Sequence, residues 1–325
     1  MYDVLTFGES MLRLSPPHAL RIEQSTGFDT YIAGSESNTA VGLARLGASV
    51  NWFSRLPESS LGKLIANGIR QQGVTTDNVI WADNERLGLY FVENGVAPRP
   101  AQVIYDRSNS AMSNIQVSDL PSDLFQEGKA KLLHVSGITL ALSATANETV
   151  LQAIKLAKEA NFLVSFDVNY RSKLWSAEDA RAGCDLCMKE ADIIFIPLRD
   201  AQLLFDYPET LSATEILKQL HDLYPQAVIV TSQGDKGSFC CSPQADIVSQ
   251  EAFQTEGIYR IGAGDSFSAG FLYSYLCQSE NLKEALTWGN AVAALKFTIS
   301  GDMPLIDKAH VEALIQHNTS SKLIR

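Results

Sequence analysis

The feature that most constrains the fold is the alternation of short apolar runs with longer helical stretches along the chain. Strand-like runs occur at 3–7, 49–54, 132–135, 162–168, 193–196 and 227–231. Between them lie amphipathic or Ala- and Leu-rich stretches, which include 37–47, 143–161 and 214–224. Apolar strands that alternate with helices predict a parallel sheet with helices on both faces. Ligands of such sheets bind at the carboxyl ends of the strands.

Two regions interrupt this alternation. Residues 12–33 contain strand-like pieces without a helix, and residues 86–107 contain two strands joined by NGVAPRP, whose prolines exclude a central strand there. We expect a β-sheet lid from 12–33 and 86–107, over an α/β core made of 1–11, 34–85 and 108–325. The expected fold class is a three-layer α/β/α fold with a mainly parallel central sheet and a small β-sheet lid. An apolar outer face on the lid predicts a homo-oligomer built through the lid.

Charge and composition exclude several classes of partner. The formal net charge of -11 argues against nucleic acid and against an anionic membrane as the main partner. No run is long enough to cross a bilayer, and we expect no signal peptide, because the first residues read as a strand. Five cysteines without a disulfide-framework spacing favour reduced thiols and a cytoplasmic location. Cys184 and Cys187 form a C-x-x-C in a helical stretch without the second pair that a zinc site needs.

The stretch IGAGDSFSAGF at 261–271 combines small residues with a carboxylate at the start of an expected helix. The backbone N–H groups of Gly262, Ala263 and Gly264 can close on an anion, because a helix N-terminus carries free donors and a positive dipole end. Asp265 would lie beside that anion and could accept a proton from a hydroxyl. A glycine turn with Asp265 near an N-cap would look the same in this stretch alone. Neither a P-loop nor a dinucleotide fingerprint occurs elsewhere.

Other polar stretches lie at strand ends or helix starts along the whole chain. They are AGSESNTAVGLARLG (33–47), FDVNYRSKLW (166–175), VTSQGDKGS (230–238), GNAVAA (289–294) and ISGDMP (299–304). Together with the complete G-A-G-D, they resemble the PfkB (ribokinase-like) family of carbohydrate kinases, in the order of that family and over nearly the whole chain. Four features are most similar to 2-keto-3-deoxygluconate kinases within the family: GES at 8–10, LGLYFVE with VIYDR, SGITLAL and NYRSKLW.

The resemblance implies a role for each matching residue in ATP-dependent phosphorylation of the terminal hydroxyl of 2-keto-3-deoxygluconate. Asp265 would be the catalytic base, and the amides of Gly262, Ala263 and Gly264 would stabilise the transferring phosphoryl group. The nucleotide would be bound by Asp167, Asn169, Thr231, Gln233, Gly234, Gly262, Gly264, Asn290, Ser300 and Gly301. The sugar acid would be bound by Gly34, Asn38, Tyr90, Tyr105, Arg107, Ile138, Arg171 and Asp265. An arginine fork suits the carboxylate that distinguishes a sugar acid from a neutral sugar.

Two departures from the family pattern bear on substrate and metal. Where many relatives that act on neutral sugars have an aspartate in the first lid stretch, this chain has Arg13. Where many relatives have N-x-x-E, it has Pro197 and Asp200. The resemblance implies ATP and Mg²⁺ as cofactors, leaves open how the metal is organised, and leaves open a need for a monovalent cation. A kinase for 5-dehydro-2-deoxygluconate or fructose, and a sugar-binding protein without turnover, remain alternative interpretations.

Overall fold

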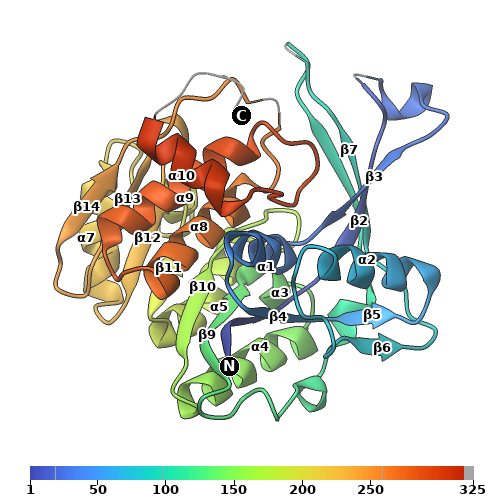
Figure 1. The fold of residues 1–325 in the computed structure, drawn as a ribbon, viewed down its shortest axis with the longest axis horizontal. Coiled ribbons are helices and arrows are strands. Elements are labelled where there is room, and N and C mark those ends of the chain that lie inside the picture. The colour runs from blue at the N-terminus through green and yellow to red at the C-terminus, as the bar shows by residue number, and fades with distance from the viewer. Residues whose placement is uncertain (19, 97, 258, 318–325) are drawn as a thin grey trace.

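The computed structural model describes residues 1–18, 20–96, 98–257 and 259–317 (Figure 1). Its central sheet has eight strands in the order β14-β13-β12-β11-β10-β9-β1-β4. Their bounds are β1 (Tyr2–Phe7), β4 (Val50–Phe53), β9 (Ala130–Ser136), β10 (Leu163–Asp167), β11 (Ile193–Phe195), β12 (Val228–Ser232), β13 (Ser238–Cys241) and β14 (Ile247–Gln250). The strands from β4 to β12 in this order pair in parallel, and β13 and β14 add an antiparallel edge. All six predicted core strands are confirmed.

Helices cover both faces of this sheet, as the alternation predicted (Figure 1). One face packs against α3 (Gly137–Leu140), α4 (Ala144–Glu159), α5 (Ala177–Glu190), α6 (Leu198–Leu204) and α7 (Ala213–Leu223). The other packs against α1 (Ser35–Leu46), α2 (Ser60–Arg70), α8 (Ala263–Cys277), α9 (Leu282–Lys296) and α10 (Lys308–His317). Successive strand residues serve opposite faces: Leu133 belongs to the first core and Leu132 to the second. Each such side chain contributes about 1.5–3 kcal/mol by burial.

The two interrupting regions form a separate four-stranded sheet in the order β3-β2-β7-β8. Its strands are β2 (Met11–Ser15), β3 (Asp29–Ala33), β7 (Leu89–Glu93) and β8 (Gln102–Asp106). In Figure 1 this small sheet projects to one side of the main body. The prediction of a smaller sheet from these regions is therefore confirmed.

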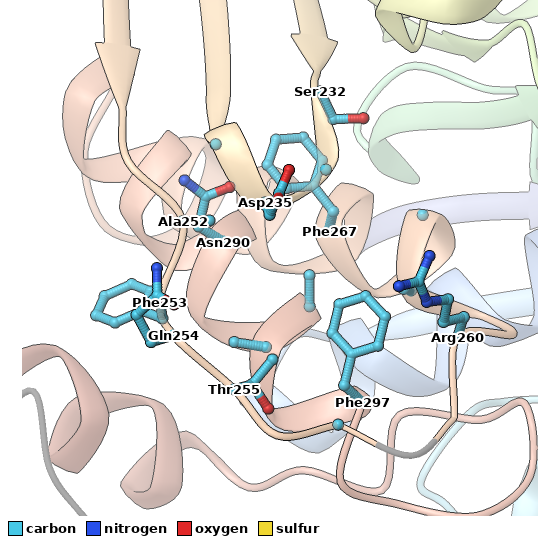
Figure 2. A pocket seen from close by; sticks show the side chains of 17 residues that line it. Ser232, Asp235, Ala252, Phe253, Gln254, Thr255, Arg260, Phe267, Asn290 and Phe297 are labelled. Atoms are coloured by element: carbon cyan, nitrogen blue, oxygen red, sulfur yellow. The ribbon is translucent and has the colours of Figure 1, made fainter. Parts of the chain in front are cut away.

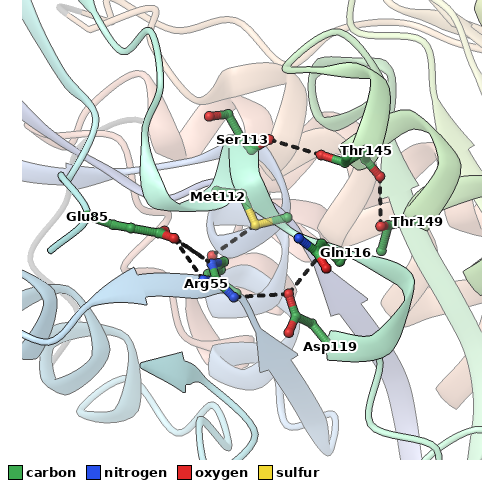
Figure 3. A network of polar contacts seen from close by, with 9 residues as sticks. Arg55, Glu85, Met112, Ser113, Gln116, Asp119, Thr145 and Thr149 are labelled. Atoms are coloured by element: carbon green, nitrogen blue, oxygen red, sulfur yellow. Dashed lines mark hydrogen bonds and ion pairs between the residues drawn. The ribbon is translucent and has the colours of Figure 1, made fainter. Parts of the chain in front are cut away.

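A third sheet of two short strands, β5 (Arg55–Pro57) and β6 (Ile80–Ala82), was not predicted. Three residues are too few to show a strand period in the sequence. Arg55 lies on β5, and its guanidinium pairs with Glu85 at 2.7 Å and with Asp119 at 3.1 Å (Figure 3). Because Glu85 precedes β7 and Asp119 follows β8, one side chain fixes both connections of the β7–β8 hairpin to the main body.

The remaining described elements are short 3-10 helices that turn the chain between strands. They are η1 (Ile22–Gln24), η2 (Ala111–Asn114), η3 (Val117–Asp119) and η4 (Gly234–Lys236). Where the structure describes the chain, no helix combines the length and the apolar character that crossing a membrane requires. The C-x-x-C pair lies on α5 as predicted, with both Cys184 and Cys187 buried in the core.

Candidate active site

A cavity of about 370 Å³ opens between the carboxyl end of β10, the start of α8 and the inner face of the small sheet. It brings together most residues predicted for the site from distant parts of the sequence. Those that line it are Gly34, Asn38, Tyr90, Tyr105, Arg107, Ile138, Asp167, Asn169, Arg171, Gly262, Ala263, Gly264 and Asp265. The strand-end position agrees with the rule for ligands of open α/β sheets.

Gly262 begins the turn that carries the catalytic candidates. It is the N-cap of α8 and has a left-handed φ of 81°. A Cβ at this position would lie 2.2 Å from the backbone oxygen of Asp302, so only glycine fits. The free N–H groups of the first turn of α8 then border the cavity, as an anion site at a helix N-terminus requires.

Asp265 lies buried in that first turn and is held by neutral donors. Ser35 Oγ donates to its Oδ1 at 2.9 Å, and Asn38 Nδ2 donates to its Oδ2 at 2.8 Å. Asn169 Nδ2 donates to Oδ1 at 3.4 Å and to Ser35 Oγ at 2.7 Å. Burial raises the pKa of Asp265, against the effect of the hydrogen bond from Asn38. A fixed carboxylate with a raised pKa suits a general base.

A second acidic group lies next to Asp265. Asp167 is the last residue of β10, and its Oδ1 accepts a hydrogen bond from the backbone N–H of Asn169 at 3.1 Å. Burial and then the charge of Asp265 raise the pKa of Asp167 well above its usual range, and Arg171 opposes the shift. Asp200, in the first turn of α6, lines the same cavity beside Pro197. Both carboxylates are hard oxygen ligands that suit Mg²⁺, either directly or by accepting hydrogen bonds from waters bound to the metal.

The opposite wall, on the small sheet, consists of arginine–carboxylate pairs. Arg107 Nη2 is bonded to Glu9, which also accepts from Ser110. Arg107 is therefore paired with a buried carboxylate, although its own buried Nε has no hydrogen-bond partner. Arg13 likewise pairs with Asp302 at 2.8 Å.

Asp302 joins this wall to the main body. Its carboxylate also accepts a hydrogen bond from the Tyr90 hydroxyl, and the guanidinium of Arg13 lies 4.2 Å from the ring centre of Tyr31. Glu9 and Asp302 both line the cavity, and the sequence analysis placed neither there.

A neighbouring cavity of about 440 Å³ meets the first at Arg260, Ala263 and Gly264. Figure 2 shows the side chains of Phe253, Phe267, Phe297 and Asn290 around it. Asn290 Nδ2 donates to the carbonyl oxygens of Gln250 and Glu251, both at 3.1 Å, and so fixes the chain that follows β14. An apolar cleft with a few polar groups next to an anion site suits a nucleotide.

The predicted nucleotide residues are only partly brought together. Gly234 and Asn290 line this second cavity, together with Ala263 and Gly264 of the turn 262–264, the anion turn. Gln233 lines an adjoining hollow beside Pro197 and Arg199. Thr231 is fully buried in the sheet, and its neighbour Ser232 lines the cavity in its place. Ser300 and Gly301 line none of these three spaces among the described residues.

Arg260 is a candidate that the sequence analysis missed. It lines both cavities and lies where they meet, as its position in Figure 2 beside the turn before α8 indicates. It is exposed, and no carboxylate of the described chain forms an ion pair with it. The available signal was an arginine five residues before the aspartate of the G-A-G-D.

Comparisons with known proteins identify the family. Residues 1–309 match the model of the pfkB family carbohydrate kinases. The chain is 37% identical over 314 residues to 2-dehydro-3-deoxygalactonokinase of Haloferax volcanii (97% of this chain, 96% of the relative). It is 30% identical over 322 residues to 5-dehydro-2-deoxygluconokinase of Bacillus licheniformis (97% and 96%).

The fold comparison gives the same family. The crystal structure of 2-dehydro-3-deoxygluconokinase from Thermotoga maritima superposes with a TM-score of 0.89 at 30% identity, and the match covers 97% of this chain and 98% of the other. The chain belongs to the PfkB family of carbohydrate kinases, which use ATP to phosphorylate sugars.

Proposed function

We propose that the protein is an ATP-dependent kinase for 2-keto-3-deoxygluconate (2-dehydro-3-deoxygluconate) that transfers phosphate to the terminal hydroxyl and gives the 6-phosphate. The observation that carries this proposal is the position of Asp265. It lies between a nucleotide-sized cleft and a cavity bordered by Arg107 and Arg171, with only neutral groups bonded to it. The names of the relatives support a keto-deoxy sugar acid as the acceptor.

The proposed reaction uses the chain's own groups in three roles. Asp265 takes the proton of the terminal hydroxyl. The hydroxyl oxygen bonds to the γ-phosphorus while the bond from that phosphorus to the bridging oxygen of ADP breaks. The amides at the start of α8 stabilise the negative charge of the transferring group, which is the main contribution in a loose transition state. Arg260 adds a cation where the two cavities meet.

Bound Mg²⁺ would neutralise phosphate charge, as it does for ATP in general. Asp167 and Asp200 are the carboxylates that fit it, because both border the cavity near the anion turn. Pro197 replaces an asparagine of the family pattern and supplies no side-chain donor or acceptor. We therefore propose that Asp167 and Asp200 accept hydrogen bonds from the waters bound to the metal.

Arg171 is the main candidate for binding the substrate carboxylate. Its side chain is exposed and, within the described residues, has no ion-pair partner. Its Nη1 donates a hydrogen bond to the carbonyl oxygen of Tyr170 at 3.1 Å. Arg107 could add its unpartnered Nε. The paired carboxylates Glu9 and Asp302 would accept hydrogen bonds from sugar hydroxyls, which both a sugar acid and a neutral sugar possess.

The epimer 2-keto-3-deoxygalactonate is a second candidate acceptor. It is favoured by the 37% identity to the Haloferax volcanii enzyme, which exceeds the 30% identity to the Thermotoga maritima structure. A panel that measures ADP release with both epimers, 5-dehydro-2-deoxygluconate, fructose and ribose tests the proposal. We expect the two keto-deoxy acids to give the highest kcat/KM. Turnover of fructose alone would contradict the substrate, and no turnover with any sugar would favour a binding protein.

We further propose that the small sheet is a lid and that it forms the contact of a homo-oligomer. Leu14, Phe91 and Ile104 are direct cross-strand neighbours, so they form one apolar row on one face of the sheet. Ile104 is exposed, and the ring of Phe28 packs on Phe91 with 5.8 Å between centroids. The adjacent cross-strand pair, Tyr90 and Tyr105, points to the other face of the sheet and lines the proposed sugar cavity. Covering the outer row in a second copy would remove apolar surface from water.

Sedimentation tests this contact directly. We expect a dimer or larger assembly at about micromolar concentration, where interfaces of moderate affinity are occupied. Ile104→Lys, which places a charge in the row, should give the 35.5 kDa monomer. Leu186→Lys, an exposed leucine on α5 far from the lid, is the control. A wild-type monomer would contradict the proposal.

We also propose a cytoplasmic location. All five cysteines are free thiols, and four of them are buried. Unpaired thiols in this number suit a reducing compartment better than an oxidising one.

A further inference from the structure

Lys296, the last residue of α9, is a buried charge that the proposed reaction does not use. Its side chain has 0% exposure. Its Nζ donates to the carbonyl oxygens of Ile299 at 3.0 Å and Gly301 at 2.9 Å. Lysine is almost never fully buried unless it is paired, and here its bonded partners are backbone carbonyls rather than a carboxylate. Burial lowers the pKa of this ammonium to about 8.

The carbonyls that Lys296 binds belong to a loop that contacts the anion turn. A Cβ on Gly262 would lie 2.2 Å from Asp302 O and 3.3 Å from Asp302 Cα, so the loop backbone packs directly on the N-cap of α8. The position of this loop therefore limits how far the backbone of the anion turn can move toward residue 302. The loop ends at 302, one residue after a carbonyl that the ammonium binds.

The same loop contacts the lid. A Cβ on Gly301 would lie 2.9 Å from a ring atom of Tyr31 on β3, and Asp302 pairs with Arg13 on β2. Asp302 also binds Tyr90 on β7. Residues 299–302 are thus held between the lid and the start of α8, and Lys296 supplies the hydrogen bonds that close this loop onto its own helix.

We propose that Lys296 is a positioning residue whose ammonium acts as a built-in cation: it holds loop 299–302 against the anion turn and removes the need for an added monovalent cation. The two carbonyl oxygens present their negative dipole ends to a positive charge, which K⁺, NH₄⁺ or a lysine ammonium can supply. Charged donors also make stronger hydrogen bonds than neutral ones. The inference rests on the kinase activity proposed above and does not depend on which sugar is the acceptor.

The test is a cation-rescue experiment with whichever sugar the wild type phosphorylates best. Lys296→Ala removes the ammonium and leaves room for a small ion. We expect kcat to fall on the order of 10²-fold, the effect of a small misplacement of catalytic groups, with a smaller change in KM. Ammonium or potassium chloride should restore much of that loss, whereas tetramethylammonium chloride at the same ionic strength should not. Wild-type kcat should be equal in all three salts.

Controls separate this role from ordinary core packing. Lys155→Ala, on the exposed part of α4, should show no salt-specific change. Lys296→Met keeps the side-chain length without the charge, so it should lose activity without rescue, and it serves also if Lys296→Ala does not fold.

Three results would overturn the proposal: a wild type that requires potassium, a folded Lys296→Ala variant with normal kcat, or a lost activity that neither ion restores. A wild type inactive on every sugar would instead contradict the proposed function. In that case thermal unfolding still tests the built-in cation, which predicts that ammonium raises the Tm of Lys296→Ala more than that of the wild type.

Discussion

The two walls of the cavity that we propose for the sugar differ in how their charged groups are paired. At the start of α8, Asp265 is held only by neutral donors from Ser35, Asn38 and Asn169. At the lid, Arg107 and Arg13 are each already bonded to a buried carboxylate. The first arrangement keeps a carboxylate able to take a proton, and the second fixes the shape of the wall. The difference teaches that a charged residue's role depends on its partner as much as on its type.

Asp265→Asn breaks the α8 side of this comparison and should have the largest effect. It keeps the side-chain shape and removes the base, so kcat should fall about 10²–10⁴-fold, the usual contribution of general base catalysis. Nucleotide affinity should stay near that of the wild type. Asp77→Asn, an exposed aspartate after α2, is the matched control and should be normal. A variant with more than about half the wild-type kcat would show that Asp265 is not the base.

Arg107→Ala breaks the lid side, where we expect a loss of stability. Removing Arg107 leaves Glu9 buried without its cation, which costs about 3–5 kcal/mol for a buried pair. Urea unfolding measures this loss. Adding Glu9→Gln to the variant should recover part of it, because no uncompensated charge then remains. A stable single variant, unchanged by the second substitution, would mean that the pair contributes nothing to the fold.

Arg171→Ala sharpens the comparison. Among the described residues this arginine forms no ion pair, so its removal leaves no buried carboxylate without a cation. Hydrogen bonds to a charged group are worth roughly 1.5–3 kcal/mol. The expected loss of kcat/KM for a sugar acid is therefore about 10–150-fold. Arg171→Lys should restore activity only in part, because a point charge does not reproduce the planar fork. Unfolding should match that of Arg70→Ala, an exposed arginine on α2. A large loss of stability would assign Arg171 a structural role instead.

The pH dependence of kcat/KM should show the smallest effect, and it tests the protonation state of Asp265. Burial raises the pKa of Asp265. The base works only when deprotonated, so kcat/KM should rise with pH through that raised value, above the ordinary value of about 3.9. Asp167→Asn separates the two neighbouring groups: the acidic limb should persist if Asp265 causes it. A limb at or below the ordinary aspartate value would contradict the raised pKa.

The sequence predicts features that depend on neighbouring residues better than features that depend on residues far apart in the chain. The core strands were predicted because apolar periodicity is local, whereas the three-residue strands β5 and β6 were too short for any period. Asp265 could be proposed from the sequence because its small neighbours and the helix start lie next to it. Ser35, which binds it, is 230 residues away, and Glu9 is 98 residues from Arg107. Such pairings have no local signal, so the sequence could not show that Arg107 is neutralised.

The lack of a local signal also explains the error at Thr231 in the cleft proposed for the nucleotide. Thr231 and Ser232 alternate on a strand, and a one-residue shift decides which of them faces the cavity. The structure selects Ser232. Lys296 shows no functional pattern in the sequence, because its partners are backbone carbonyls that any residue would provide.

The most direct test of the account is a ratio of two specificity constants. We would measure kcat/KM for 2-keto-3-deoxygluconate and for fructose, in the wild type and in Arg171→Ala. The account predicts a ratio well above one in the wild type, and a fall of about 10–150-fold in the variant because only the sugar acid loses a charged partner. A wild-type ratio below one, or a high ratio that the substitution leaves unchanged, would contradict it.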